Sequence, residues 1–297
     1  MTSKLKAKPP GEVIAKKPKI LIYGPPGVGK TWFSLDFPQP YYIDTEGGAS
    51  YKHYMDKLTK SGGQRMGPED GSLDFATVLE QVQALATEKN HGFNTLVIDS
   101  ATKLFNTSVA LEAERLGDKD AFGASKKPAI AYMRRLVSWI QKLDMNVILI
   151  AHQKEAWGIN GKGDRVQTGV TLDCWDKLEY ELDLSLAAIK QGPSRFITPI
   201  KSRLLSFPEN ERLPMEFAQF QERYGKEIIS KEAVPIVLAT EEQVKEIQRL
   251  LSIVKMDEKI IEKWKTAAGA ETFEEFTTEQ AAGVITALKA KVSGESK

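Results

Sequence analysis

The fold is decided by the stretch Gly24-Pro25-Pro26-Gly27-Val28-Gly29-Lys30-Thr31. An apolar run over 20–23 precedes it, and a predicted helix over 30–36 follows it. This is the phosphate-loop pattern G-x-x-x-x-G-K-[ST] in the strand–loop–helix context that the pattern requires. Backbone N–H groups of such a loop and the positive end of the helix bind phosphates. We therefore predict a nucleotide site over 24–32, including Trp32, with Lys30 on the β- and γ-phosphates and Thr31 on Mg²⁺.

Two further segments end in acidic residues. The apolar run 93–98 reads as a buried strand that ends at Asp99, which we expect beside Thr31 as a second Mg²⁺ contact, through water. A shorter strand over 41–43 leads into Asp44 and Glu46. Open α/β sheets bind ligands at the carboxyl ends of their strands, so both acids are expected near the γ-phosphate.

A hydrolase needs one carboxylate to deprotonate the attacking water. Ser100, which follows Asp99, cannot do this, so Glu46 is the candidate general base. The alternative is that Asp44 and Glu46 only cap a turn or the next helix.

Composition narrows the class of protein. With 297 residues, 41% hydrophobic and 27% charged, the chain is typical of a soluble globular protein. No apolar run approaches the roughly 18 residues of a membrane span. The single Cys174 excludes an internal disulfide framework, and we expect a cytoplasmic location. The net charge of +1 gives no domain-wide basic surface, so any DNA contact must be local.

The pattern along the chain predicts four parts. They are a flexible basic arm over 1–18, an α/β ATPase core over 19–233, a linker over 234–240 and a helical interaction module over 241–292. In the core, strands and helices alternate, which predicts a mostly parallel sheet with helices on both faces. We expect 47–72 to be an irregular Gly-rich segment, and we expect 177–189 and 195–201 to add antiparallel strands at the sheet edge. Thr240 with Gln243 predicts a capping box, and Thr278 is expected at a later helix start.

Several motifs resemble those of RecA-type recombinases, including archaeal RadA. They are Ile43-Asp44-Thr45-Glu46-Gly47, Val147-Ile148-Leu149-Ile150-Ala151-His152-Gln153 and the segment from Phe196 to Arg203. The resemblance implies a RecA-like P-loop fold, with Glu46 as the catalytic base and Gln153 as a sensor of the γ-phosphate. It also implies that Lys201 and Arg203, where the family has a Lys-x-Lys pair, act on the γ-phosphate of a neighbouring subunit.

The segment 153–171 occupies the place of the family's second DNA-binding loop. Its basic and aromatic residues are Lys154, Trp157, Lys162 and Arg165, set among four glycines. Basic side chains interleaved with an aromatic ring on a flexible loop suit single-stranded nucleic acid, because the charges contact phosphates and the ring stacks on a base. Glu155 and Asp164 dilute this pattern, and a lid or a plain mobile loop is the alternative.

Over residues 19–228 the chain most closely resembles phage nucleotide-binding ATPases, among them short RecA-like recombinases of the Sak-four type. This implies a homo-oligomer, ring or filament, that uses ATP and Mg²⁺ to act on single-stranded DNA in phage recombination or replication, by annealing or strand exchange. The C-terminal helices would bind a partner such as a single-strand-binding protein. The alternatives are a helicase loader or motor ATPase, and a nucleotide-dependent scaffold that recruits replication proteins.

Overall fold

The computed structural model describes residues 15–121 and 123–293, and most of the predicted basic arm lies outside them. Within this part, the strands form one nine-stranded sheet in the order β3-β2-β4-β5-β1-β7-β8-β9, with β6 paired to β5. The strands are β1 (Lys19–Tyr23), β2 (Pro40–Asp44), β3 (Gln64–Met66), β4 (Thr95–Asp99), β5 (Asn146–Ile159), β6 (Arg165–Asp173), β7 (Leu184–Gln191), β8 (Ser194–Ser202) and β9 (Leu213–Pro214). From β3 to β7 all neighbours in this order are parallel, whereas β6, β8 and β9 pair antiparallel.

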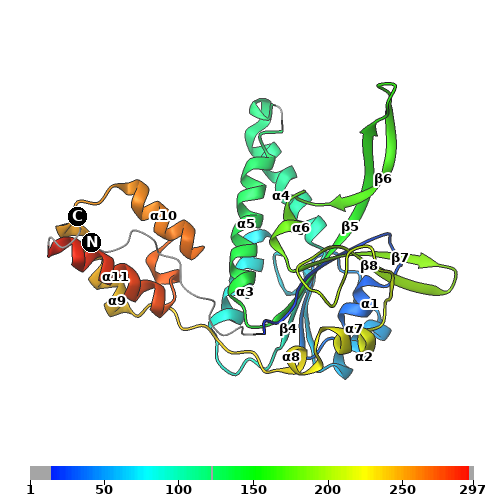
Figure 1. Cartoon of the computed structure of the whole chain (residues 1–297), viewed down its shortest axis with the longest axis horizontal. Helices are drawn as coiled ribbons and strands as arrows, with labels where there is room; N and C mark the ends of the chain where they lie inside the picture. The colour runs from blue at the N-terminus through cyan, green and yellow to red at the C-terminus, as the bar shows by residue number, and fades with distance from the viewer. Residues whose placement is uncertain (1–14, 122, 294–297) are drawn as a thin grey trace.

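Helices cover both faces of the sheet (Figure 1). In the core they are α1 (Lys30–Ser34), α2 (Lys52–Lys60), α3 (Phe75–Thr87), α4 (Ala101–Leu116), α5 (Lys126–Lys142), α6 (Leu178–Glu181), α7 (Phe217–Tyr224) and α8 (Lys226–Ser230). Successive side chains of a strand point to opposite faces. Leu96 and Ile98 of β4 therefore join the core under α3, α4 and α5, and Val97 joins the core under α1 and α7. The predicted fold class, a mostly parallel α/β P-loop fold flanked by helices, is confirmed.

Two predictions about the core were wrong. The segment 47–72 is not irregular throughout, because it contains α2 and β3 and so adds a strand to the sheet edge. The helix α2 is stabilised by Leu58, which is buried in the core under α1 and α7. The Gly-rich sequence around it gives no indication of this tertiary contact. In addition, β7 runs parallel to β1, and only β8 and β9 add the predicted antiparallel pairing.

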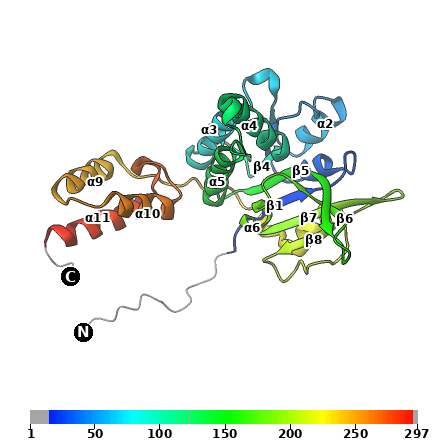
Figure 2. The same cartoon turned by 90° about the horizontal axis from the view of Figure 1, so that it is seen from above.

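A helical module follows the core, as predicted. It comprises α9 (Glu241–Ile253), α10 (Glu258–Ala268) and α11 (Thr278–Val292), packed around a core of their own (Figure 2). Thr240 and Gln243 form the predicted capping box. The second box is made by Thr277 with Gln280, one residue before the expected Thr278.

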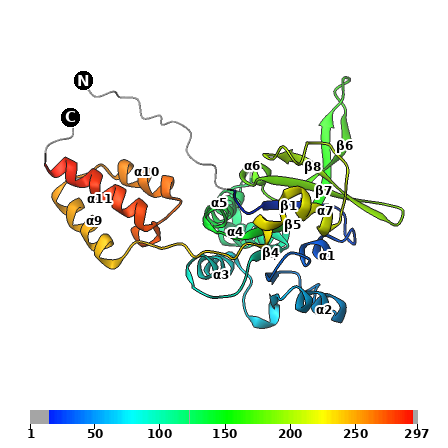
Figure 3. The same ribbon diagram turned by 60° about the horizontal axis from the view of Figure 1, so that its bottom comes forward.

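The module contacts the core through α5 (Figure 3). Arg135 forms ion pairs with Glu271, at 3.1 Å, and with Glu275. The Ser138 hydroxyl donates a hydrogen bond to the Gly269 carbonyl oxygen at 3.1 Å. Residues 234–240 form no helix and, apart from an isolated bridge at Leu238, no strand. None of the helices in the described ranges is both long and apolar enough to cross a membrane.

Candidate nucleotide site

The phosphate loop lies between β1 and α1, at the carboxyl edge of the sheet. Gly24 has φ +156°, and a Cβ there would lie 2.4 Å from the Ala188 carbonyl oxygen of β7, so only glycine lets the loop pass this strand. The Lys30 side chain is buried and its Nζ donates to the carbonyl oxygens of Gly24, at 2.8 Å, and Pro25, at 3.0 Å. Burial lowers the pKa of Lys30, against the opposing effect of nearby Asp99 and Glu46. The lysine thus lies folded over the loop that is predicted to bind phosphates.

The two predicted Mg²⁺ contacts lie together. The Thr31 hydroxyl donates to Asp99 Oδ2 at 2.6 Å, and the Tyr42 hydroxyl donates to the same oxygen at 2.9 Å. Burial raises the pKa of Asp99, and these two hydrogen bonds oppose that rise. A hydroxyl and a carboxylate are oxygen ligands of the kind that Mg²⁺ prefers, and its sites keep several waters. The donor set at Thr31 and Asp99 therefore fits the ion.

Asp44 and Glu46 differ sharply in their surroundings. Asp44 is 1% exposed and accepts hydrogen bonds from three backbone N–H groups of the turn that follows it. Its Oδ2 also accepts from Arg65 Nε at 3.0 Å. Asp44 thus stabilises the turn, which agrees with the alternative that this acid caps a turn. Glu46 Oε1 accepts from the Ser100 hydroxyl and lies 2.8 Å from His152 Nε2, with 34% of the Glu46 side chain exposed.

Two cavities adjoin along the phosphate loop and share Gly27, Gly29 and Tyr54. The first has a volume of about 490 Å³, and the predicted site residues on its wall include Lys30, Thr31, Glu46, Asp99 and Gln153 as well as residues of the phosphate loop. The structure therefore brings together residues from four separate segments of the chain.

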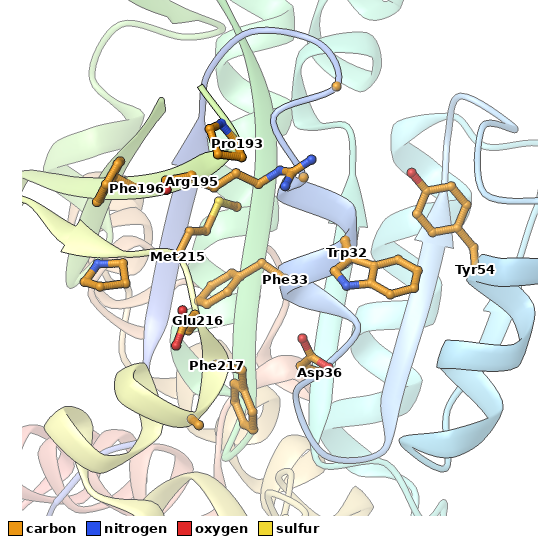
Figure 4. Close-up of a pocket in the computed structure, with 15 residues that line it drawn as sticks. Trp32, Phe33, Asp36, Tyr54, Pro193, Arg195, Phe196, Met215, Glu216 and Phe217 are labelled. Atoms are coloured by element: carbon orange, nitrogen blue, oxygen red, sulfur yellow. The ribbon is translucent and has the colours of Figure 1, made fainter. Parts of the chain in front are cut away.

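The second cavity, of about 990 Å³, is lined by aromatic side chains (Figure 4). Trp32 and Tyr54 lie on one side of it, and Arg195, Phe196 and Met215 lie on the other (Figure 4). The cavity adjoins the phosphate loop, and the aromatic rings on its wall could stack on a nucleobase. Sequence reasoning included Trp32 but missed Tyr54 and Arg195, because both reach the loop only through the tertiary fold.

The predicted DNA-binding loop is a β-hairpin, so the expectation of a flexible loop was wrong. Strand β5 continues beyond the sheet and pairs with β6 from His152↔Asp173 to Ile159↔Arg165, and the hairpin projects from the core (Figure 1). Four glycines suggested a loop, yet Gly158 and Gly169 lie inside the paired strands. Trp157 is 49% exposed, with the Arg165 guanidinium 5.1 Å from its ring centre.

The other two predicted DNA contacts, Lys154 and Lys162, lie at opposite ends of the hairpin. Lys154 lies at the root of the hairpin, where its Nζ is 3.9 Å from Asp173 and 3.7 Å from Asp176. Lys162 is exposed in the turn at the tip. The positive charge of Lys154 is therefore partly offset, and that of Lys162 faces solvent.

Lys201 and Arg203 lie away from the phosphate loop of their own chain. β8 runs antiparallel to β7, so Arg195 at its start is beside Gly29 and Lys201 near its end pairs with Ser185 at the start of β7. Lys201 Nζ donates to the Leu182 carbonyl oxygen, and Arg203 donates to that of Tyr180 at 2.6 Å. Within one chain, these two cations do not join the site.

Comparison with known proteins gives one family match. A family model described as an AAA domain matches residues 16–214, a range that includes the phosphate loop, Asp99 and the hairpin. Among solved structures, the chain is similar to the RadB recombinase, with 17% identity, 67% of this chain and 86% of that chain covered, and a TM-score of 0.42. It is also similar to a prototypical ATPase from the type III secretion system of pathogenic bacteria, with 13% identity, 96% and 89% covered, and a TM-score of 0.39. No curated protein matches.

Proposed function

We propose that this chain, which belongs to the AAA domain family and is a P-loop ATPase, couples Mg²⁺-dependent ATP hydrolysis to the binding of single-stranded DNA. One observation carries the proposal. Strand β5 places Gln153 on the wall of the phosphate cavity and then continues as the exposed hairpin that bears Trp157 and Arg165. A ligand on the hairpin and a nucleotide in the cavity would therefore contact the same continuous strand.

The residues of the cavity have the chemistry that hydrolysis needs. The loop N–H groups and Lys30 would bind the phosphates. Thr31, and Asp99 through water, would hold a Mg²⁺ ion, which would supply positive charge to the phosphate oxygens. Glu46 takes the proton of the attacking water, since one of its oxygens is contacted by Ser100 and His152 and the other is left for water. Gln153 reports the γ-phosphate to the hairpin through its side-chain amide.

The hairpin has the features of a single-strand contact. Trp157 offers a half-exposed ring for base stacking, and Arg165 and Lys162 supply charge for phosphates. The hairpin is a local surface, which agrees with the near-neutral charge of the chain. We further propose that annealing or strand exchange in recombination is the outcome of this binding.

The test is the rate of ATP hydrolysis with and without single-stranded DNA, for the wild type and for Glu46→Gln. The wild type is expected to accelerate with DNA, and Glu46→Gln is expected to bind nucleotide normally but to hydrolyse it roughly 10²-fold more slowly. Hydrolysis that is indifferent to DNA would count against the coupling. An annealing assay with complementary oligonucleotides then separates this function from helicase loading, because a loader would not accelerate annealing by itself.

Lys201 and Arg203 are proposed to complete the site of a neighbouring subunit in a homo-oligomer. Their place far from their own phosphate loop supports this assignment. The helical module, with its separate core, is proposed to recruit a replication partner such as a single-strand-binding protein.

A further inference from the structure

The hydroxyl of Thr102 joins the two strands at the root of the hairpin. Thr102 is the second residue of α4 and is 3% exposed. Its Oγ1 donates to the Asp173 carbonyl oxygen at 2.6 Å and accepts from the His152 backbone N–H at 2.8 Å. His152 and Asp173 form the pair of the hairpin ladder nearest the core. One buried hydroxyl therefore links α4 to β5 and β6 where the hairpin leaves the sheet.

The side chain of the same His152 contacts the candidate base. His152 Nε2 lies 2.8 Å from Glu46 Oε1, a close polar contact between the imidazole and the carboxylate. Ser100 donates to the same oxygen. Within 15–121 and 123–293, no residue makes a hydrogen bond to Glu46 Oε2. The Ser100 hydrogen bond and the His152 contact thus both fall on Oε1 and leave the second oxygen of the carboxylate for water.

The first turn of α4 carries both contacts. Ser100 is the N-cap of this helix, where its hydroxyl accepts from the Lys103 backbone N–H at 3.1 Å, and Thr102 lies two residues further on. Because Thr102 contacts both strands, a displacement of β6 relative to β5 would alter its two hydrogen bonds. Two sets of contacts connect Thr102 to Glu46, one through His152 and one through Ser100. Neither set of contacts passes through Gln153.

We propose that His152 is a positioning residue for Glu46, and that Thr102 transmits the binding of a single strand on the hairpin to this carboxylate. The proposal rests on the proposed function, in which Glu46 is the base and the hairpin binds DNA. In the absence of DNA, His152 is held by the sheet as well as by Thr102, since the preceding residues of β5 are paired to β1 and β4.

The first test concerns His152. In His152→Ala the carboxylate loses the contact with the imidazole, so kcat without DNA is expected to fall by about 10- to 100-fold, the scale of a misplaced catalytic group, while the Kd for ATP stays unchanged. His152→Gln keeps an N–H donor and is expected to recover part of the loss. A purely structural role would lower the melting temperature of both variants without this recovery. An unchanged kcat in a folded His152→Ala would overturn the positioning role.

The second test concerns Thr102. Thr102→Val keeps the shape but removes the hydroxyl, so basal hydrolysis and DNA affinity are expected to persist while the acceleration by an oligo-dT strand is lost. Thr102→Ser is expected to restore it. Thr107→Val, an exposed threonine on the same helix, is the matched control and should accelerate like the wild type. Full acceleration in Thr102→Val would overturn the transmission.

The two proposals fail in different ways. If the wild type does not accelerate with DNA, the proposed function fails and the transmission through Thr102 fails with it, while basal kcat of the His152 variants still decides the positioning role. If the wild type accelerates and Thr102→Val does so equally, only the transmission fails.

Discussion

Replacing Asp44 by Asn tests whether this acid stabilises the turn or performs chemistry. The carboxylate is buried, accepts three backbone N–H groups and pairs with Arg65, whose side chain is 9% exposed. An amide of the same shape has one acceptor oxygen, and its NH₂ group then faces donors. It also leaves the Arg65 cation without this partner.

Breaking a buried pair by removing one member costs about 3–5 kcal/mol. Arg65 keeps its bond to exposed Glu69, so we place the loss for Asp44→Asn at the lower end, about 3 kcal/mol. For a domain of this size that loss lowers the melting temperature by roughly 6–12 °C. Hydrolysis should fall less than in Glu46→Gln, because the turn that carries Glu46 is loosened but the base remains.

The assay is thermal and urea unfolding of Asp44→Asn, Arg65→Gln and the double variant, each beside its rate of hydrolysis. The double variant is expected to cost clearly less than the sum of the single variants, because the two side chains share one interaction. Glu46→Gln is the matched control. It makes the same carboxylate-to-amide change on a partly exposed side chain and should shift stability by less than about 1 kcal/mol. An Asp44→Asn protein of wild-type stability that cannot hydrolyse ATP would refute the reasoning and make Asp44 the catalytic acid.

Four further outcomes are expected. Lys30→Ala should abolish binding in a fluorescent-nucleotide titration and leave the unfolding curve intact, whereas retained turnover would contradict the site. Trp157→Ala should weaken single-strand binding by about 1–3 kcal/mol in an anisotropy titration, and a wild-type affinity would move the DNA contact elsewhere. Subunits with Lys201→Ala and Arg203→Ala, mixed with Lys30→Ala subunits, should regain partial turnover at mixed interfaces, and no rescue in a co-assembled mixture would reject action across subunits. Burial lowers the pKa of Lys19 from 10.5 to about 7, so between these pH values the unfolded chain binds more protons than the folded one. The free energy of unfolding therefore rises with pH, by at most about 1.4 kcal/mol per pH unit. Lys19→Met should flatten that rise in urea unfolding from pH 7 to pH 9, and an unchanged slope would contradict the argument.

The sequence could predict the phosphate loop and the strand that ends at Asp99, because both depend on residues next to each other in the chain. A loop of this pattern fixes its own backbone, and a buried strand places its last residue at the carboxyl edge beside the loop. These two facts predict that Thr31 and Asp99 are neighbours, and the structure adds the 2.6 Å hydrogen bond between them.

Contacts between residues far apart in the chain could not be predicted from the sequence. Arg65 reaches Asp44 only because β3 pairs with β2, and Arg195 reaches Gly29 only because β8 folds back along β7. The hairpin of β5 and β6 was not predicted for a different reason. Glycines disfavour strands on average, but they are tolerated in an exposed two-stranded ribbon. In each case the pattern in the chain is compatible with the structure but does not specify it.

The different roles proposed for the three acids at the sheet edge rest on the groups that each carboxylate contacts. Asp44 accepts from three N–H groups and one guanidinium, so both its oxygens are occupied and it has none for a reacting water. Asp99 accepts hydrogen bonds from two hydroxyls, those of Thr31 and Tyr42, on a single oxygen. The Thr31 hydroxyl is of the kind that binds Mg²⁺, so Thr31 and Asp99 could both bind one Mg²⁺ ion in place of their hydrogen bond. Glu46 accepts a hydrogen bond from Ser100 and contacts His152 through the same oxygen, and its side chain is partly exposed on the cavity wall. It is the acid whose surroundings both hold it in place and leave it free to accept a proton, and this is what a general base requires.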